Sequence, residues 1–528
     1  MPFPPRTRAT DEVVAPTLVD PLARASSAAV GGPLGRHARS GWSWWTPLRV
    51  IVLVAIVMFG VGVFQKSPCE QSTWPVSPRQ YSHMCYSDIG FLYAGRGFAE
   101  GILPFEPHSD LPANKQPTSV QESNDLSLEY PVLTGVWMEG ASLVTHLIGD
   151  SPNLSNVPHS QVGGMASVQH DSTVFWAVNA FGFFLVLLLA LILLIRAQPR
   201  RPWDAMFIAA SPALALTAFI NWDMLAIGCV AGILWAWATR RTVLAGLFIG
   251  LGTATKLYPV LLIGPLLILC LRERKMQTWV KTVAAALTTW LIIDLPVYIW
   301  SPDGFLYFWR FNAARGPDLG SAWLIGYFFG HGASPHQINV TTWVVFGGAC
   351  LLIAALGLLA PRRPRFVQLA FLVVACFLLI NKVYSPQYVL WLLPLAALAR
   401  PRWRDMLIWQ ACEVFYFFAV WMHLANFFVP AGACTSGGFF ASFHGCDWVY
   451  ILSILIRMAG EIYLIVMVVR DILSPWRDPV RSDGLSDDPL GGIFDEGIDS
   501  EPIPAAEPTL VGADSAAEGW WDHEDPGP

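Results

Sequence analysis

The sequence predicts an all-α polytopic membrane protein with about twelve transmembrane helices. Hydrophobic residues make up 54% of its 528 residues, charged residues only 14%, and the mean hydropathy is +0.46. The apolar residues gather in runs close to the ~20 residues that a helix needs to cross a bilayer. This composition excludes a soluble multidomain protein. The expected spans are residues 48–65, 172–195, 203–219, 222–238, 243–257, 258–271, 277–300, 341–360, 366–381, 386–400, 405–428 and 449–470.

The basic residues predict the orientation of these spans. Loops that face the cytoplasm carry an excess of lysine and arginine. If the N-terminus lies inside, every basic cluster falls on the cytoplasmic side, and the C-terminus lies inside as well. The clusters are Arg36/Arg39/Arg49, Arg196/Arg200/Arg201, Arg240/Arg241, Arg272/Arg274/Lys275, Arg362/Arg363/Arg365 and Arg400/Arg402/Arg404.

One further apolar stretch, Tyr130–Gly149, is also long enough to cross. Counting it as a span would move every later arginine cluster to the outside. We therefore expect a re-entrant or interfacial helix on the outer face. It would belong to a first outer loop, residues 66–171, that carries juxtamembrane helices.

The two ends of the chain differ in composition from the membrane domain, residues 48–472. Residues 1–47 are rich in Pro, Ala, Ser, Gly and Arg, and residues 473–528 are acidic and rich in Pro and Gly. Both read as disordered cytoplasmic tails. About 47 residues precede the first span, so a cleaved signal peptide is not expected.

The nine cysteines divide into two groups. Four of them fall two per outer loop, and this distribution predicts the disulfides Cys69–Cys85 and Cys434–Cys446 in an oxidising compartment. The others lie within spans, where cysteine acts as a small apolar residue. They are Cys229, Cys270, Cys350, Cys376 and Cys412.

Charged side chains gather at the outer ends of the predicted helices. Hydrocarbon tolerates such groups only with partners or a water-filled cavity, so we expect one shared outer cavity. A transporter would instead hold its ionisable residues near the bilayer midplane. The outer group is Asp88, Arg96, Glu129, Asp223, Lys256, Asp294, Arg310, Arg315, Asp318 and Lys382.

Other polar residues within the spans read as structural. Arg457 and Glu461, spaced i, i+4, can pair with each other and with Glu413. His423 is expected to be a histidine satisfied within the bundle. The sequence has no metal-ligand spacing, P-loop or Rossmann fingerprint, so we expect no cofactor, no metal and no nucleic-acid partner.

The outer cations suit a phosphate group. Lys256 and Lys382, with Arg310 or Arg315, are the candidate donor-phosphate ligands, although either lysine could simply extend its amine to the interface. Since nucleotides are absent outside the cell, an activated donor there would be lipid-linked. In NKVYSPQY, residues 381–388, the side chains expected to line the donor site are Asn381, Tyr384 and Gln387.

A series of short motifs carries a family resemblance. DIGFLYAGRGFAEGILPF, EYPVL, GLFIGLGTATKLYP, FNAARGPDLGSAW and NKVYSPQYVLWLLP occur in this order across the membrane region. Together they resemble the GT-C glycosyltransferases, specifically the family 87 polyprenol-phosphate-mannose-dependent mannosyltransferases of actinobacteria.

The resemblance implies a plasma-membrane enzyme that moves a sugar, mannose above all, from a polyprenyl phosphate to an envelope glycolipid or polysaccharide, with inversion. It implies that Asp88 is the catalytic base, a role that also needs a carboxylate with a tuned pKa. Asp88 could instead be a solvated residue paired with Arg96. Glu129, Asp223 and Asp318 are further substrate-binding candidates. The alternatives are a transporter or flippase for a lipid-linked sugar, and a non-catalytic membrane scaffold.

Overall fold

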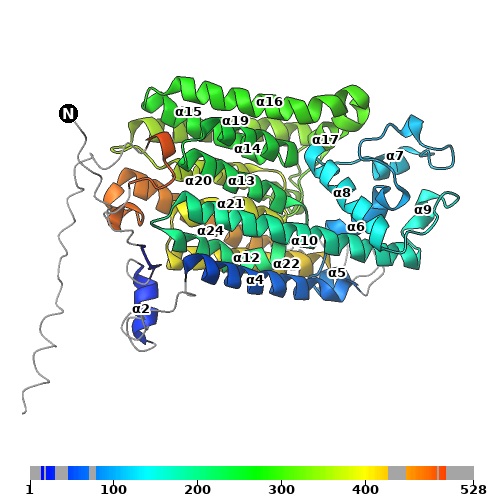
Figure 1. Ribbon diagram of the computed structural model, residues 1–528, viewed down its shortest axis with the longest axis horizontal. Helices are drawn as coiled ribbons and strands as arrows, with labels where there is room; N and C mark the ends of the chain where they lie inside the picture. Colours follow the sequence, from blue (N-terminus) through cyan, green and yellow to red (C-terminus); the bar gives the residue numbers. More distant parts are fainter. Residues whose placement is uncertain are drawn as a thin grey trace, which may run out of the picture.

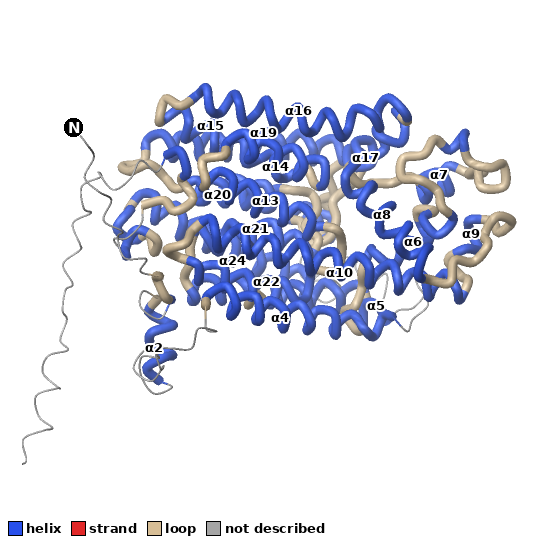
Figure 2. The backbone as a smooth tube through the Cα atoms, viewed as in Figure 1, coloured by secondary structure: helices blue, strands red, loops and turns tan. Residues whose placement is uncertain are grey.

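The computed structural model describes residues 13–16, 20–29, 46–70, 79–425, 448–483 and 487–494. Over these residues the chain is helical and contains no strand (Figures 1 and 2). Most helices run roughly side by side in one bundle. The helices of the first loop, α5 to α9, lie at one end of it, called here the loop end (Figure 1).

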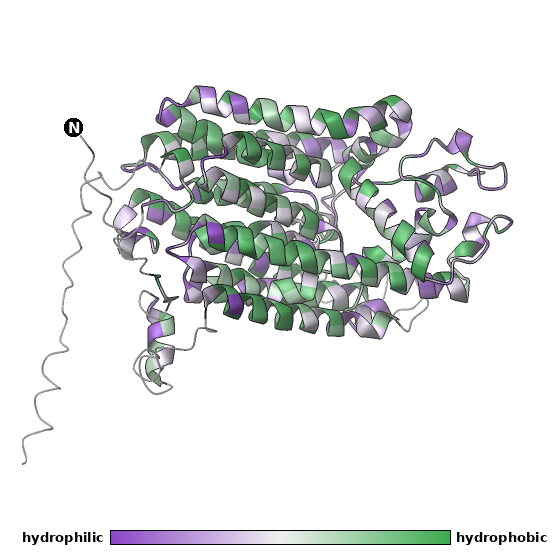
Figure 3. Ribbon diagram, viewed as in Figure 1, coloured by the Kyte–Doolittle hydropathy of each residue, from purple (hydrophilic) through white to green (hydrophobic). Residues whose placement is uncertain are grey.

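Within the described part of the chain, six helices are long and apolar enough to cross a membrane. Hydrophobic residues follow the bundle helices along their length, whereas hydrophilic ones gather at the ends and in the loops (Figure 3). The six are α4 (Pro47–Glu70), α10 (Ala166–Ala197), α16 (Met276–Trp300), α19 (Pro335–Leu359), α22 (Trp403–Leu424) and α24 (Trp448–Leu473).

Shorter apolar helices fill the centre of the bundle, and several join a 3-10 turn to an α-helix. Lengths of 10–17 residues do not by themselves establish a membrane span. The structure therefore supports a polytopic membrane protein, and the twelve spans and their orientation stay predictions. These helices are α13 (Asp223–Ala238), α14 (Thr242–Thr255), η4 (Tyr258–Leu262) with α15 (Ile263–Arg272), α20 (Phe366–Ile380), and η5 (Pro386–Tyr388) with α21 (Val389–Ala399).

The expected span at residues 203–219 is not one continuous helix. It consists of η3 (Pro202–Ala205), α11 (Met206–Ala209) and α12 (Pro212–Thr217). The break falls at Ser211, which is extended and caps α12 with its side chain. Pro212 explains the break, because a proline disfavours helical geometry in the residue before it.

The apolar stretch after Tyr130 forms α8 (Val132–Ile148), which packs against α10, α14 and α16 at the loop end (Figure 1). Val136, Leu143 and Leu147 remain exposed along one of its faces. This exposed apolar stripe is typical of a helix at a membrane interface. The neighbouring short helices are α5 (Arg79–Ser82), α6 (Asp88–Gly95), η1 (Phe98–Glu100), η2 (His108–Asp110), α7 (Val120–Leu126) and α9 (His159–Val162).

A disulfide joins Cys69 at the end of α4 to Cys85 in the first loop. Two hydrogen bonds reinforce the connection, from Gln65 Nε2 to the Met84 carbonyl (2.6 Å) and from Lys66 Nζ to the Tyr86 carbonyl (3.0 Å). The second predicted pair, Cys434 and Cys446, lies outside the described residues.

Part of each predicted tail is packed against the end of the bundle opposite the loop end. Residues 474–483 and 487–494 contain η6 (Pro475–Arg477), η7 (Arg481–Asp483) and η8 (Gly492–Phe494), and we call this segment the clasp. Phe494 contacts the ring of Trp237, whose indole N–H donates to the Gly491 carbonyl. At the N-terminal side, α2 (Pro21–Ala29) follows Asp20, which accepts the Trp403 N–H. Composition alone predicts disorder for both tails, but these parts of them make buried contacts with the bundle.

The clasp is attached by a buried ion pair. Arg365 Nε lies 2.8 Å from Asp478, and both side chains are almost completely buried. The same guanidinium donates to the carbonyls of Leu398 and Ala399 at the end of α21. One arginine therefore joins α20, α21 and the clasp.

Replacing Arg365 with methionine is expected to lower the free energy of unfolding by about 3–5 kcal/mol, because Asp478 would remain as an uncompensated buried charge. Thermal unfolding of the detergent-purified protein measures the effect. Arg196→Met, in the exposed last turn of α10, is the matched control and should leave the midpoint unchanged. Equal midpoints for the two variants would show that the ion pair does not hold the clasp.

Candidate functional site

A cavity of about 480 Å³ lies where the bundle meets the first-loop helices. A group of loops interrupts the helices in this region (Figure 2). The wall also includes α17 (Pro302–Ala314), and α18 (Ala322–Phe328) follows it in the chain. Polar and charged lining residues are Asp88, Glu129, Asn221, Lys256, Asn312, Arg315, Asp318, Asn381, Ser385 and Gln387, and the aromatic ones are Tyr81, Tyr86, Tyr130, Tyr258, Phe308, Phe311, Phe377, Tyr388, Trp391 and Trp421.

Asp88 is the first residue of α6, and local hydrogen bonds fix its position. Ser87 caps the helix through its hydroxyl, which also donates to the Phe219 carbonyl. The Asp88 N–H donates to the Ile220 carbonyl at 2.8 Å. The first loop is thereby tied to the turn before α13, more than a hundred residues later in the chain.

The Asp88 carboxylate accepts hydrogen bonds from two neutral groups. Tyr86 Oη lies 2.5 Å from Oδ1, and Asn221 Nδ2 lies 2.7 Å from Oδ2. Burial raises the pKa of Asp88, the hydrogen bonds from Tyr86 and Asn221 oppose this effect, and the charge of Glu129 adds to it. The net result is a carboxyl group whose pKa lies above its usual value.

Asn221 connects Asp88 to a cation. Its Nδ2 also donates to Tyr130 Oη at 2.5 Å, while its Oδ1 accepts the Lys256 ammonium at 3.2 Å. Lys256 lies 3.5 Å from Asp223, and its ammonium lies 5.0 Å from the centre of the Tyr130 ring. One amide therefore stands between the carboxylate and the positive charge.

The other two cavity carboxylates each bond an arginine. Glu129 lies 2.8 Å from Arg96 Nε and 2.9 Å from Nη2, a bidentate pair that ties α6 to the segment before α8. Asp318 accepts from Arg315 Nε at 3.0 Å. Arg315 and Lys256 are thus two cations on the wall of the same cavity.

Several predicted site residues lie outside the cavity lining. Lys382 is buried and donates to the Asn312 carbonyl (2.5 Å) and to Asn339 Oδ1 (2.7 Å). Arg310 is exposed and pairs with Asp303 at 3.0 Å. Arg96, Asp223 and Tyr384 are absent from the lining as well, although Arg96 and Asp223 hold the lining residues Glu129 and Lys256. Of the side chains predicted to line the donor site from NKVYSPQY, Asn381 and Gln387 line the cavity, and so do Ser385, Pro386 and Tyr388 of the same stretch.

Tyr384 belongs to a buried network beneath the cavity. Its hydroxyl donates to Glu413, and the Arg457 guanidinium lies 3.7 Å from the centre of its ring. Arg457 also bonds Glu461 at 2.9 Å. The structural role expected for these charged residues agrees with this geometry, and the His423 ring stacks on Tyr450 at 4.2 Å.

The sequence-based analysis missed the uncharged groups that contact the charges. Tyr86, Tyr130 and Asn221 each bond another polar side chain of the cavity. A signal was present, because Asn221 stands two residues before Asp223 in NWD and Tyr130 directly follows Glu129. Spacing along the chain does not reveal that an amide, rather than a second charge, holds Asp88.

Comparison with known proteins gives one family match. Residues 164–381 match the sequence model of glycosyltransferase family 87. The match covers less than half of the 528 residues. It supports a membrane glycosyltransferase of the GT-C type, which takes a sugar donor and an acceptor. No curated protein matches the chain.

The matched region contains part of the cavity wall. Asn221, Lys256, Arg315 and Asp318 lie within it, whereas Asp88 precedes it. The match extends from the residues just before α10 to Asn381, the first residue of NKVYSPQY. The cavity thus combines part of the matched region with the first loop and with residues after Asn381.

Three cavity-lining side chains have a buried polar atom without a hydrogen-bond partner among the described residues. They are Tyr258 Oη, Gln387 Oε1 and Trp421 Nε1. Leaving such a group unpaired costs about 1–3 kcal/mol. Their concentration in one cavity indicates that bound substrate or water completes their hydrogen bonds.

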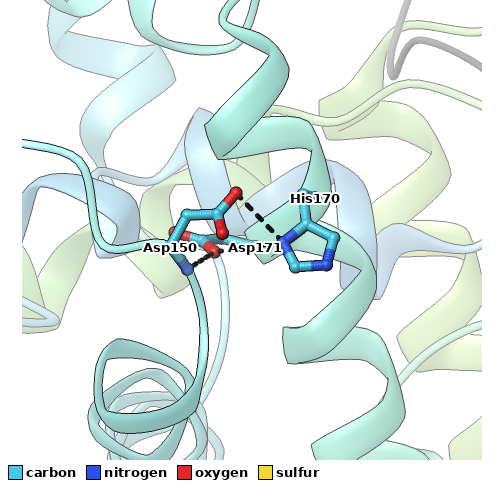
Figure 4. Close-up of side chains that lie close together, drawn as sticks. All are labelled: Asp150, His170 and Asp171. Carbon is cyan, nitrogen blue, oxygen red and sulfur yellow. Dashed lines mark hydrogen bonds and ion pairs between the residues drawn. The ribbon is translucent and has the colours of Figure 1, made fainter.

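A separate group of possible metal ligands lies in the first loop. Asp150, His170 and Asp171 bring their ligand atoms within 4.8 Å of one another (Figure 4). The Asp171 oxygens accept the backbone N–H groups of Asp150 (2.7 Å) and Ser151 (3.0 Å). We assign the group a structural role, because these bonds attach the loop after α8 to the start of α10.

Arg310 and Arg315, at the C-terminal end of α17, provide a matched test of the cavity. Arg315→Gln should reduce the apparent affinity for the sugar donor about 10- to 100-fold, the usual effect of losing a hydrogen bond to a charged group. Arg310→Gln, five residues earlier and exposed, should change it less than twofold. Donor KM in a transfer assay measures both. The same loss in both variants, or in neither, would remove Arg315 from the donor site.

Proposed function

We propose that the protein transfers a sugar, mannose on the family resemblance, from a polyprenyl phosphate to an envelope glycolipid or polysaccharide, with Asp88 as the base. The observation that carries the proposal is the difference among the three cavity carboxylates. Glu129 and Asp318 bond arginines, whereas Asp88 is held by the neutral groups of Tyr86 and Asn221. A carboxylate without a paired cation keeps a pKa suited to accepting a proton.

In the proposed reaction, Asp88 removes the proton from an acceptor hydroxyl. A lone pair of that oxygen forms the new bond to the anomeric carbon from the face opposite the leaving group. The bond from carbon to phosphate oxygen breaks, and its electron pair leaves with the polyprenyl phosphate. Attack from the opposite face inverts the anomeric configuration.

Lys256 and Arg315 are proposed to bind the donor phosphate. Charge develops on this phosphate as the bond breaks, and fixed cations on the cavity wall stabilise it. Lys256 is 3.5 Å from Asp223, and Arg315 bonds Asp318, so each cation has a carboxylate that holds it in place. Lys382 is proposed to support this wall, since its ammonium bonds the Asn312 carbonyl at 2.5 Å.

The position of the cavity favours an enzyme over a transporter. Its polar groups lie at helix ends and loops of the loop end, as with Asp88 at the start of α6 and Lys256 at the end of α14. A transporter would instead hold its charged site near the bilayer midplane. With the predicted topology, the loop end faces outward from the plasma membrane, where a lipid-linked donor can enter from the bilayer.

Asp88→Asn should lower the transfer rate by about 10²- to 10⁴-fold, the usual range for loss of a general base. The amide is nearly isosteric but cannot accept the proton. Transfer from radiolabelled polyprenyl-phosphate-mannose to envelope lipids measures the rate. Asp110→Asn, in the first loop outside the cavity lining, is the matched control. A folded Asp88→Asn protein with near wild-type transfer would move the base to Glu129 or Asp318.

Tyr86→Phe should shift the acid limb of the pH–rate profile upward by about one pH unit. Transfer needs deprotonated Asp88, so the rate falls as the pH drops through its pKa. The Tyr86 hydrogen bond lowers that pKa, and its loss raises it. Tyr93→Phe removes a hydroxyl from the same helix as Asp88 without touching the carboxylate, and it should leave the limb in place. A downward shift in Tyr86→Phe would argue against Asp88 as the titrating group.

A further inference from the structure

Three aromatic side chains form one side of the cavity, next to Asp88. Tyr81 and Trp421 are nearly parallel, with ring centres 6.1 Å apart and an interplanar angle of 15°. Tyr86 lies 5.3 Å from Trp421 and 5.8 Å from Tyr81. All three line the cavity, and we call them the aromatic wall.

The aromatic wall is held in place by the first loop. Tyr86 directly follows Cys85, which the disulfide ties to Cys69 on α4. The Tyr86 carbonyl accepts the Lys66 ammonium at 3.0 Å. Tyr81 belongs to α5, which packs against α22, the helix that carries Trp421. The rings are therefore positioned by covalent and polar links before any ligand binds, as in a pre-formed binding site.

The aromatic wall combines flat apolar faces with polar groups at its edges. Trp421 is buried, and its indole N–H is without a hydrogen-bond partner among the described residues. The Tyr86 hydroxyl points to the Asp88 carboxylate at 2.5 Å. A pyranose ring has the complementary form, with an apolar C–H face and a rim of hydroxyl groups. Aromatic rings with a polar handle suit ligands of this kind.

The contacts of Asp88 place the aromatic wall on the acceptor side. Its Oδ1 is bonded by Tyr86, a member of the wall, whereas its Oδ2 is bonded by Asn221, which accepts Lys256 on its other end. The base therefore stands between the wall and one of the cations proposed to bind the donor phosphate. A hydroxyl carried by a molecule on the wall can reach the base without crossing the phosphate site.

We propose that the aromatic wall binds a sugar ring of the acceptor, with the Trp421 N–H donating to one of its hydroxyls. The inference rests on the proposed function and makes it more specific. The acceptor is then a glycoside, and the sugar next to the reacting hydroxyl is recognised through its ring. A bare lipid alcohol would leave both the ring faces and the indole N–H unused.

Two probes with the same alkyl chain test the inference. Octyl α-D-mannopyranoside carries a pyranose ring, and 1-O-octylglycerol carries hydroxyls without a ring. Binding to the full-length protein in lipid nanodiscs is measured below the critical micelle concentration. We expect the wild-type protein to bind the mannoside about 10-fold more tightly than the glycerol ether, from ring stacking and one hydrogen bond.

Substitutions of Trp421 separate the contributions of the ring and the N–H. Trp421→Phe should weaken mannoside binding about 3- to 10-fold, and Trp421→Leu should abolish the preference over octylglycerol. Trp176→Phe, the same change in α10 outside the cavity lining, should leave both affinities unchanged. If Trp421→Leu does not fold, Tyr81→Leu at the partly exposed edge of the wall replaces it.

Donor binding distinguishes failure of this inference from failure of the proposed function. Equal affinity of the wild-type protein for the two probes would overturn the acceptor subsite. A Trp421→Phe variant that loses affinity for polyprenyl phosphate instead of the mannoside would also overturn it. If the wild-type protein binds no polyprenyl phosphate yet shows the Trp421-dependent preference for the mannoside, the proposed donor is wrong and the sugar subsite stands.

Discussion

The hydrogen bond from Asn221 to Asp88 is the interaction on which the organisation of the cavity depends. It joins the first loop to the turn before α13, and through the other end of the amide it reaches Lys256. A direct contact between carboxylate and ammonium would stabilise both charges and depress the pKa of the acid. The intervening amide keeps the carboxylate hydrogen-bonded but unpaired, so an unpaired carboxylate and a cation can share one cavity.

Other charged side chains of the cavity lining are paired with a charge of opposite sign. The cation Arg315 has its own carboxylate, and Glu129 has its own arginine. Buried charges are costly unless they are paired and hydrogen-bonded. Among the described residues, Asp88 has no paired cation and instead accepts hydrogen bonds from two neutral donors. Its burial raises its pKa. The cavity carboxylate without a paired cation is thus the one that we propose as the base.

Sequence reasoning located the region of the site better than the contacts within it. The charged residues Asp88, Lys256 and Arg315 were identifiable because charge is rare in an apolar chain and its position is therefore informative. The aromatic and amide partners of these charges stand out less in the sequence, because Tyr and Asn are common at helix ends. Lys382 shows the opposite case: it is conspicuous in the sequence, but its ammonium bonds Asn312 and Asn339 and lies outside the cavity lining, an orientation that depends on tertiary packing. The packed clasp was hidden by a composition that is also typical of disordered tails.

The clasp has a consequence for how the protein is made. Arg365 is synthesised more than a hundred residues before its partner Asp478, and Trp237 more than 250 residues before Gly491. During translation the chain therefore carries a guanidinium and an indole whose final partners do not yet exist. Domains generally fold in order of synthesis, but this end of the bundle can close only after the last membrane helix has left the ribosome. The last contacts at this end of the bundle therefore form late. The ion pair between Arg365 and Asp478 is one of them.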